Sequence, residues 1–160
     1  MSQGQPEIEQ LDADDWHVLR DVRLAALQDS PECLGDRYNY EKGGSEQQWR
    51  DFLRKRTRFV AMVENRPVGM ISVGEGGWSG TAAITSVWVD PGFRCRGTGD
   101  ALVVTALGWA EAKGLRQVFL RVNEGCEGAQ RLYCRHGFRR TGETRRLAGG
   151  RLEYEMSLKF

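Results

Sequence analysis

The stretch from Val87 to Ala101 constrains the fold of this chain more than any other. It opens as an extended apolar run that Asp90-Pro91-Gly92 interrupts, because proline lacks a backbone N–H and glycine permits unusual backbone angles. Gly97-Thr98-Gly99 then leads into a segment without charged residues from Ala101 to Ala110. The pattern predicts a strand, a turn, a glycine-rich loop and a buried helix in direct succession.

The loop between this strand and this helix is suited to bind phosphate groups. Backbone N–H groups gather at a helix N-terminus, where the helix dipole places about half a positive charge. Glycines let a ligand approach that backbone closely, and Arg94 and Arg96 add positive charge. A Walker loop would need a Gly-Lys-Ser/Thr sequence that is absent, and a dinucleotide fingerprint would need a third glycine where Leu102 stands. The alternative is an ordinary glycine-rich turn with surface arginines.

Length and composition suit one globular domain over residues 1–160, with residues 1–6 as a loose tail. No apolar run approaches the roughly 20 residues that span a bilayer, and the start of the chain lacks a signal-peptide pattern. We therefore expect a cytoplasmic protein without a membrane partner. The four cysteines, Cys33, Cys95, Cys126 and Cys134, form no Cys-x-x-Cys pair and no metal-like cluster with the two histidines. They are expected to be free thiols, and no metal site is expected.

Charge is distributed unevenly along the chain. The net charge of +1 argues against nucleic acid as the main partner. Residues 1–51 carry twelve Asp and Glu against five Lys and Arg, whereas residues 52–160 carry ten against eighteen. This division would suit a cationic acceptor on one side and an anionic cofactor on the other, although charged faces are usually just solvated.

Hydrophobic periodicity predicts the other elements. Helical spacing covers residues 13–28 and 45–56, whereas residues 32–44 give no strong periodic signal. Strands are expected at 8–11, 59–63, 68–73, 81–89 and 117–122, helices at 98–113 and 129–136, and a closing hairpin at 138–145 and 152–158. This order of elements is typical of a mixed α/β sheet.

Two motifs and this order of elements resemble the GNAT superfamily of acyl-CoA-dependent N-acyltransferases. The spacing Arg94-x-x-Gly97-x-Gly99 is similar to the family's pyrophosphate loop. Val122-Asn123, followed by Ala129-Gln-Arg-Leu-Tyr133 and Gly137-Phe138, is similar to its second cofactor motif. The resemblance extends from Ile8 to Leu158. It implies a GNAT fold, that is, a mixed and mostly antiparallel sheet of about seven strands with four helices and a splayed pair of parallel strands.

The resemblance also implies a site for acetyl-CoA, or another short acyl-CoA, between the splayed strands. Val87, Trp88 and Val89 would line the cleft, and a backbone N–H near Val89 would stabilise the oxyanion of the thioester. Asn123 would help to anchor the pantetheine arm. The pyrophosphate would be held by the loop and the helix start, which comprise Arg94, Cys95, Arg96, Gly97, Thr98, Gly99 and Asp100.

Tyr133 is the candidate general acid, which would protonate the departing CoA thiolate. A phenol is a neutral donor with a pKa near 10, so it can deliver a proton as the thiolate forms. The alternative is a core tyrosine, because a tyrosine on an apolar helical face is often buried for packing alone.

Two features depart from the family pattern. Cys126 stands where the second motif usually has an asparagine, and we do not expect it to act as a nucleophile because the family transfers its acyl group directly. Residues 81–86 contain no carboxylate, although many relatives have a glutamate base in this strand. The candidates for the general base therefore remain a water held by Thr85 or Ser86, the carboxylate of Glu75 or Glu41, and solvent alone.

The sequence thus predicts an N-acetyltransferase that moves acetyl from acetyl-CoA to a primary amine of a small molecule or peptide. The amine would attack directly in a ternary complex. The missing strand carboxylate keeps a non-catalytic acyl-CoA-binding module open as an alternative, and a nucleotide-binding regulator is a weaker one. The acceptor amine is not identified by any motif. Small domains of this kind frequently pair, so a homodimer is also open.

Overall fold

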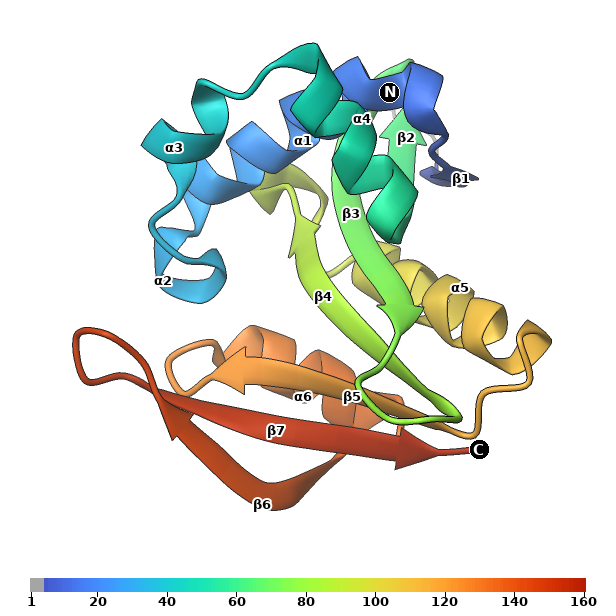
Figure 1. Ribbon diagram of the computed structural model, residues 1–160, viewed down its shortest axis with the longest axis vertical. Coiled ribbons are helices and arrows are strands. Elements are labelled where there is room, and N and C mark those ends of the chain that lie inside the picture. Colours follow the sequence, from blue (N-terminus) through green and yellow to red (C-terminus); the bar gives the residue numbers. More distant parts are fainter. Residues whose placement is uncertain (1–4) are drawn as a thin grey trace.

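The computed structural model describes residues 5–160, which form a seven-stranded sheet with helices on both faces (Figure 1). The strands are β1 (Glu7–Gln10), β2 (Thr57–Val63), β3 (Arg66–Glu75), β4 (Thr81–Val89), β5 (Gln117–Asn123), β6 (Arg139–Arg146) and β7 (Leu152–Lys159). The helices are α1 (Trp16–Asp29), α2 (Pro31–Leu34), α3 (Tyr38–Lys42), α4 (Glu46–Lys55), α5 (Thr98–Ala112) and α6 (Glu127–Arg135), with short 3-10 turns η1 (Ala13–Asp15) and η2 (Pro91–Phe93). Of the expected tail, residues 1–4 lie outside the described residues, and residues 5 and 6 precede β1 without regular structure.

The strand order is β1-β2-β3-β4-β5-β7-β6, and β4 and β5 are the parallel pair. The other neighbouring strands are antiparallel. This topology confirms the predicted fold class, a mixed and mostly antiparallel sheet with one parallel pair. The number of helices differs, because two short helices, α2 and α3, form where the sequence gave no periodic signal.

The parallel strands β4 and β5 separate after a few residues. Their pairing begins at Thr81 and Gln117 and ends at Ile84 and Leu120, although both strands continue. Beyond this point the register between β3 and β4 shifts, and Ser86 takes a positive φ of 57°. Such a bulge bends a strand. Figure 1 shows β4 and β5 diverging toward α2, so the splayed pair implied by the resemblance is present.

The alternation of side chains along β4 divides the core between the two faces. Val87 and Val89 pack with the cluster under α5 and α6, whereas Trp88 is buried in the cluster under α1 and α4. Burial of α5 against the sheet explains its long segment without charges, because residues such as Leu102 and Val103 are fully buried.

The two short helices are held by long-range contacts rather than by their own sequence pattern. Isolated helices of four or five residues are unstable in water, because nucleation fixes several residues for one hydrogen bond. Pro31 at the first position favours the start of α2, and the buried carboxylate of Glu41 ties α3 to Arg23 on α1. Residues 32–44 therefore acquire their structure from the tertiary fold.

The prediction of four free thiols was wrong for two of them. Cys33 in α2 and Cys126 at the start of α6 form a disulfide, with Cα atoms 6.1 Å apart and a sequence separation of 93. Cys95 and Cys134 are free and exposed. Sequence spacing gave no indication of this pair, because only the folding of α2 over the end of β5 brings the two cysteines together.

We expect loss of this disulfide to lower the free energy of unfolding by about 2–4 kcal/mol, because the bond restricts a long loop of the unfolded chain. The measurement is denaturant unfolding of the protein and of a Cys33→Ser/Cys126→Ser variant, each with and without reductant. The matched control is Cys95→Ser/Cys134→Ser, which removes the two free thiols and should change stability by less than about 0.5 kcal/mol. Equal stability of the two double variants would contradict the prediction.

Candidate functional site

The loop between β4 and α5 is shaped by local hydrogen bonds and by two left-handed residues. The Asp90 side chain accepts a hydrogen bond from the Gly92 N–H at 2.9 Å, and Phe93 is buried in the core. Cys95 and Gly97 then take positive φ values of 60° and 84°. Glycine adopts this conformation without steric cost, and the chain thereby turns into α5.

The N-terminus of α5 has backbone donors without a capping side chain. Its first intrahelical bond runs from the Ala101 N–H to the Gly97 carbonyl, at 3.0 Å. Gly97 occupies the N-cap position and has no side chain to accept the preceding N–H groups. The hydroxyl of Thr98 is buried and has no hydrogen-bond partner in the described part of the chain. These free donors suit an anion at this helix end.

The two loop arginines differ in their surroundings. Arg94 donates from Nε to the Val89 carbonyl at 2.8 Å and from Nη2 to the Asp29 carboxylate at 2.7 Å. It therefore joins the end of β4 to α1. Arg96 is exposed and lies over the Phe93 ring, 5.8 Å from its centroid. Arg96 is the loop guanidinium that remains available to a phosphate.

Gly99 and Asp100 connect α5 to α6. A Cβ at Gly99 would lie 3.2 Å from Cδ2 of Leu132, so glycine permits the close approach of the two helices. The Asp100 carboxylate lies 2.7 Å from Nε2 of His136 and 3.2 Å from Nη2 of Arg135. Burial raises the pKa of Asp100, but hydrogen bonds from His136 and Arg135 outweigh it and hold the pKa below its ordinary value.

Asn123 contacts α2 at the end of β5. Its side-chain amide donates to the Glu32 carbonyl at 2.8 Å and to the Cys33 carbonyl at 3.3 Å. Together with the disulfide, these bonds fasten α2 across the open end between β4 and β5. The amide of Asn123 is thus engaged within the protein in this structure.

Tyr133 lies on the buried face of α6. It is 5 % exposed and packs edge-on against Phe138, with ring centroids 6.0 Å apart. Among residues 5–160, no group is hydrogen-bonded to its hydroxyl, and burial raises its pKa above 10.0, the ordinary value. The phenol therefore remains protonated throughout the physiological pH range.

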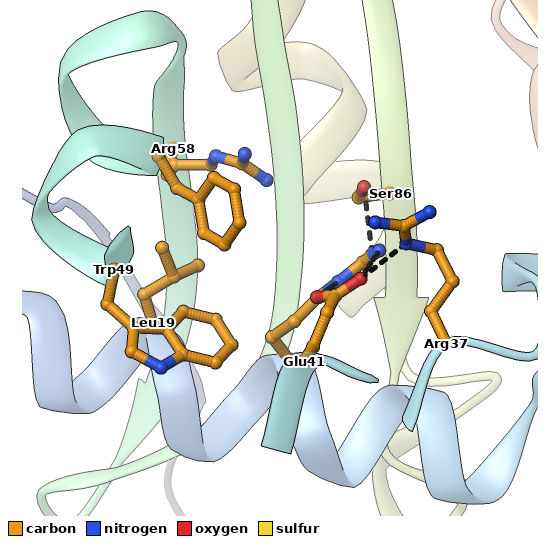
Figure 2. A pocket seen from close by; sticks show the side chains of 8 residues that line it. Leu19, Arg37, Glu41, Trp49, Arg58 and Ser86 are labelled. Carbon is orange, nitrogen blue, oxygen red and sulfur yellow. Dashed lines mark hydrogen bonds and ion pairs between the residues drawn. The ribbon is translucent and has the colours of Figure 1, made fainter. Parts of the chain in front are cut away.

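A pocket lies beside the bulge in β4, on the face of the sheet that α1 and α4 cover. Its volume is about 150 Å³, and it receives side chains from α1, α3, α4, β2 and β4 (Figure 2). The lining residues are Leu19, Arg23, Arg37, Glu41, Trp49, Phe52, Arg58 and Ser86. Apolar side chains and charged groups thus share one cavity next to the point where β4 departs from β5.

Glu41 is the centre of the charged side of this pocket. Its carboxylate accepts hydrogen bonds from Nε of Arg23 at 2.9 Å and from Nε of Arg37 at 2.8 Å. Arg23 also donates to the Ser86 hydroxyl at 3.1 Å. Burial raises the pKa of Glu41, but the hydrogen bonds and charges of the two arginines outweigh it, so its pKa lies below the ordinary value.

The structure distinguishes between the open candidates for the base. Glu41 and Ser86 line the same pocket, whereas Glu75 pairs with Ala82 at the opposite end of β4. Thr85 is exposed next to the bulge. The lowered pKa of Glu41 keeps it ionised, but it also makes the carboxylate a weak base.

Two arginines of this pocket, Arg23 and Arg37, were not singled out from the sequence, although Arg23 lies within an otherwise apolar helix face. Arg58 belongs to the basic run from Arg54 to Arg58, for which the sequence predicts a solvated face or a contact with the CoA adenosine 3′-phosphate; in the structure it lines this pocket. The pocket lining thus contains three guanidinium groups and one carboxylate, that of Glu41. The charged residues that line this pocket therefore carry more positive than negative charge.

Residues 5–160 contain no group of three or more His, Cys, Asp or Glu side chains that could hold a metal ion. In the same range no helix combines the length and apolar character needed to cross a membrane.

A curated relative, an uncharacterized N-acetyltransferase of Methanocaldococcus jannaschii, is 35% identical over 112 residues, which are 64% of this chain and 49% of that protein. This chain therefore spans about half the length of that relative.

Solved structures share the fold at low sequence identity. A GNAT-family acetyltransferase of Streptococcus pneumoniae has a TM-score of 0.83 at 17% identity, covering 97% of this chain and 99% of that one. A putative streptothricin acetyltransferase of Bacillus anthracis, in complex with acetyl coenzyme A, has a TM-score of 0.60 at 22% identity, covering 66% and 63%. Residues 16–138 match the acetyltransferase (GNAT) family. The chain therefore belongs to the GNAT family of acetyltransferases.

Proposed function

We propose that the protein transfers acetyl from acetyl-CoA to a primary amine of a small molecule or peptide. The observation that carries the proposal is the uncapped N-terminus of α5 at the end of β4, where β4 and β5 have separated. The Bacillus anthracis structure, which contains acetyl coenzyme A, supports the choice of co-substrate. The pocket around Glu41 would receive the amine from the other face of the sheet.

The residues have distinct roles in this proposal. Acetyl-CoA supplies the thioester that is attacked. Backbone N–H groups from Arg94 to Asp100, including those of Cys95, Gly97, Thr98 and Gly99, hold the pyrophosphate, and the Arg96 side chain adds charge. Val87, Trp88 and Val89 line the path of the pantetheine arm with their backbone groups, and the N–H near Val89 stabilises the oxyanion. Asn123 supports this path by holding α2.

Two proton transfers complete the reaction. The amine gives its proton to water at the Ser86 end of the pocket, because the Glu41 oxygens are already hydrogen-bonded to arginines. Tyr133 then donates its phenolic proton to the departing thiolate and regains a proton from solvent, so that the phenol is restored before the next turnover.

A non-catalytic acyl-CoA-binding module is the second candidate. It is favoured by the engaged state of Glu41 and by the absence of a carboxylate from β4. Saturable binding of acetyl-CoA without release of CoA in the presence of any amine would identify this alternative.

We expect Arg96→Glu to weaken acetyl-CoA binding at least tenfold, because it reverses an exposed charge beside the free donors of α5. The measurement is calorimetric titration with acetyl-CoA. We choose Arg96 for the substitution rather than Gly99, because a side chain at position 99 would crowd Leu132 and disturb the contact between α5 and α6. The matched control is Arg54→Glu on the exposed face of α4, which should bind as tightly as the unmodified protein. If the unmodified protein showed no binding heat on titration with millimolar acetyl-CoA, this result would contradict the proposed function.

We propose that the protein acts in the cytoplasm, and a homodimer remains a prediction. The Cys33–Cys126 bond makes the compartment testable, because disulfides are rare in reducing compartments. Alkylation of thiols in intact cells followed by mass measurement would report whether this pair is reduced there.

A further inference from the structure

The pocket on the α1/α4 face has an excess of positive charge. Arg23 and Arg37 are both engaged with Glu41, so this part of the pocket is internally paired. Arg58 is the third guanidinium, and no carboxylate in residues 5–160 forms an ion pair with it. Figure 2 shows Arg58 reaching into the pocket from β2, apart from the Glu41 cluster and near Leu19 and Trp49.

The surroundings of Arg58 disfavour a charged guanidinium that has no counter-ion. Its Nε is buried and lacks a hydrogen-bond partner within the described residues. Burial, together with the charges of Arg23 and Arg56, lowers the pKa of Arg58 to about 10, although Glu41 partly opposes this. The side chain is still charged at neutral pH, and a nearby anion would stabilise it.

Neighbouring polar atoms on the same face are also unpartnered. Ser72 is paired with Arg58 in the β2–β3 register, and its buried hydroxyl has no hydrogen-bond partner in residues 5–160. Arg56 lies at the end of α4, just before β2, and donates from Nη2 to the Ala83 carbonyl, but its buried Nε has no hydrogen-bond partner within the described residues. Guanidinium groups are donors only, and a hydroxyl is both a donor and an acceptor, so a ligand with acceptor atoms would complement these unpartnered groups.

We propose that the acceptor amine carries a carboxylate that binds to Arg58 while its amine lies at the Ser86 end of the pocket. This inference rests on the proposed transferase function and specifies its substrate class. The planar fork of a guanidinium matches the two oxygens of a carboxylate. Leu19, Trp49 and Phe52 supply an apolar wall for the remainder of the molecule. The cavity is smaller than the roughly 300–1,000 Å³ of typical ligand pockets, which favours an acceptor group the size of one amino acid.

The positions of the two strands suggest how such an acceptor would extend. β3 lies between β2 and β4, so about 10 Å, or two interstrand spacings, separates the backbone of Arg58 from that of Ser86. In Figure 2 the guanidinium of Arg58 points toward the side of the pocket on which Ser86 lies. The amine and the carboxylate would therefore be a few bonds apart, as in an amino acid or an acidic residue at the start of a peptide.

The test compares amines that differ only in the carboxylate. Leucine is paired with 3-methylbutylamine for a free amino acid, and aspartyl amide is paired with asparaginyl amide for an acidic side chain. In one of the two pairs, we expect the unmodified protein to use the amine that has the carboxylate with a kcat/KM at least tenfold higher than that of its partner. A preference in the leucine pair would assign the bound group to the carboxylate of a free amino acid, and a preference in the aspartyl amide pair would assign it to an acidic side chain. Arg58→Met, which retains an apolar stem, should remove this preference. The control Arg54→Met, at an exposed position of α4, should preserve it.

A binding measurement separates failure of this inference from failure of the proposed function. Calorimetric titration of the same amines without acyl-CoA should show the same preference, and its loss in Arg58→Met, even if no acetyl transfer occurs. Binding of acetyl-CoA with equal use of both members of each pair would overturn the carboxylate site and leave the transferase function standing. Preference for phosphoethanolamine over both carboxylates would also overturn it. If Arg58→Met does not fold, as judged by circular dichroism, Arg58→Lys should retain the charge and lose most of the preference.

Discussion

Tyr133→Phe is expected to lower turnover about 100-fold while the affinity for acetyl-CoA stays within about twofold. The substitution removes only the hydroxyl, and the ring would still pack against Phe138. Because no protein group in residues 5–160 is hydrogen-bonded to this hydroxyl, its loss leaves no buried partner unsatisfied and stability should be nearly unchanged. Release of CoA measured with a thiol reagent gives turnover, and calorimetry gives affinity.

The matched control for this substitution is Tyr154→Phe on β7, where the ring lies against the Arg140 guanidinium at 4.0 Å. We expect this variant to turn over like the unmodified protein. Unchanged turnover in Tyr133→Phe would remove the hydroxyl from the mechanism and make Tyr133 a packing residue. The raised pKa adds a pH criterion: ionisation of Tyr133 should not reduce turnover at pH values below 10.0, its ordinary pKa.

Glu41→Gln should lower the free energy of unfolding by about 3 kcal/mol, at the lower end of the range for breaking buried ion pairs. The Glu41 side chain is 4% exposed and that of Arg23 is 13% exposed, so the substitution leaves Arg23 buried without a counter-charge. Arg37 is 54% exposed and can turn toward solvent, which limits the loss. Denaturant unfolding at pH 7 measures the difference.

The pH dependence of this difference has a defined sign. The folded-state pKa of Glu41 is lowered, so its contribution is fully present above its ordinary pKa of 4.5 and is lost as the pH falls through the folded-state value. The stabilities of the two proteins should therefore converge in acid. Glu127→Gln is the control, because its ion pair with Arg131 is exposed and should contribute less than about 1 kcal/mol. A constant difference between Glu41→Gln and the unmodified protein across the acid range would contradict this account.

Elements with a local cause were predictable from the sequence. The strand β4 was expected and found at 81–89, because β-branched residues precede a Pro-Gly turn. The start of α5 at Thr98 follows from the glycine loop and the apolar segment after it. In contrast, α2, α3 and the Cys33–Cys126 bond depend on partners far away in sequence, so their own residues carry little signal.

The candidate site shows the same division. The loop residues lie together because they are consecutive, whereas the pocket combines side chains from five elements. The sequence does not distinguish Arg23, Arg37 and Arg58 from one another, because only the fold determines that two of them are paired with Glu41 and one is not. The engagement of Asn123 with the carbonyls of α2 is likewise a property of the tertiary structure.

The fastening of α2 to the end of β5 has a consequence for how a long ligand exchanges. The disulfide and the Asn123 bonds hold α2 next to the end of β5 and the start of α6, because the Cys33 and Cys126 Cα atoms are kept 6.1 Å apart. The helix cannot move away from β5 while the bond is intact. Exchange of any ligand that needs α2 to move should therefore become faster when a reductant breaks the bond.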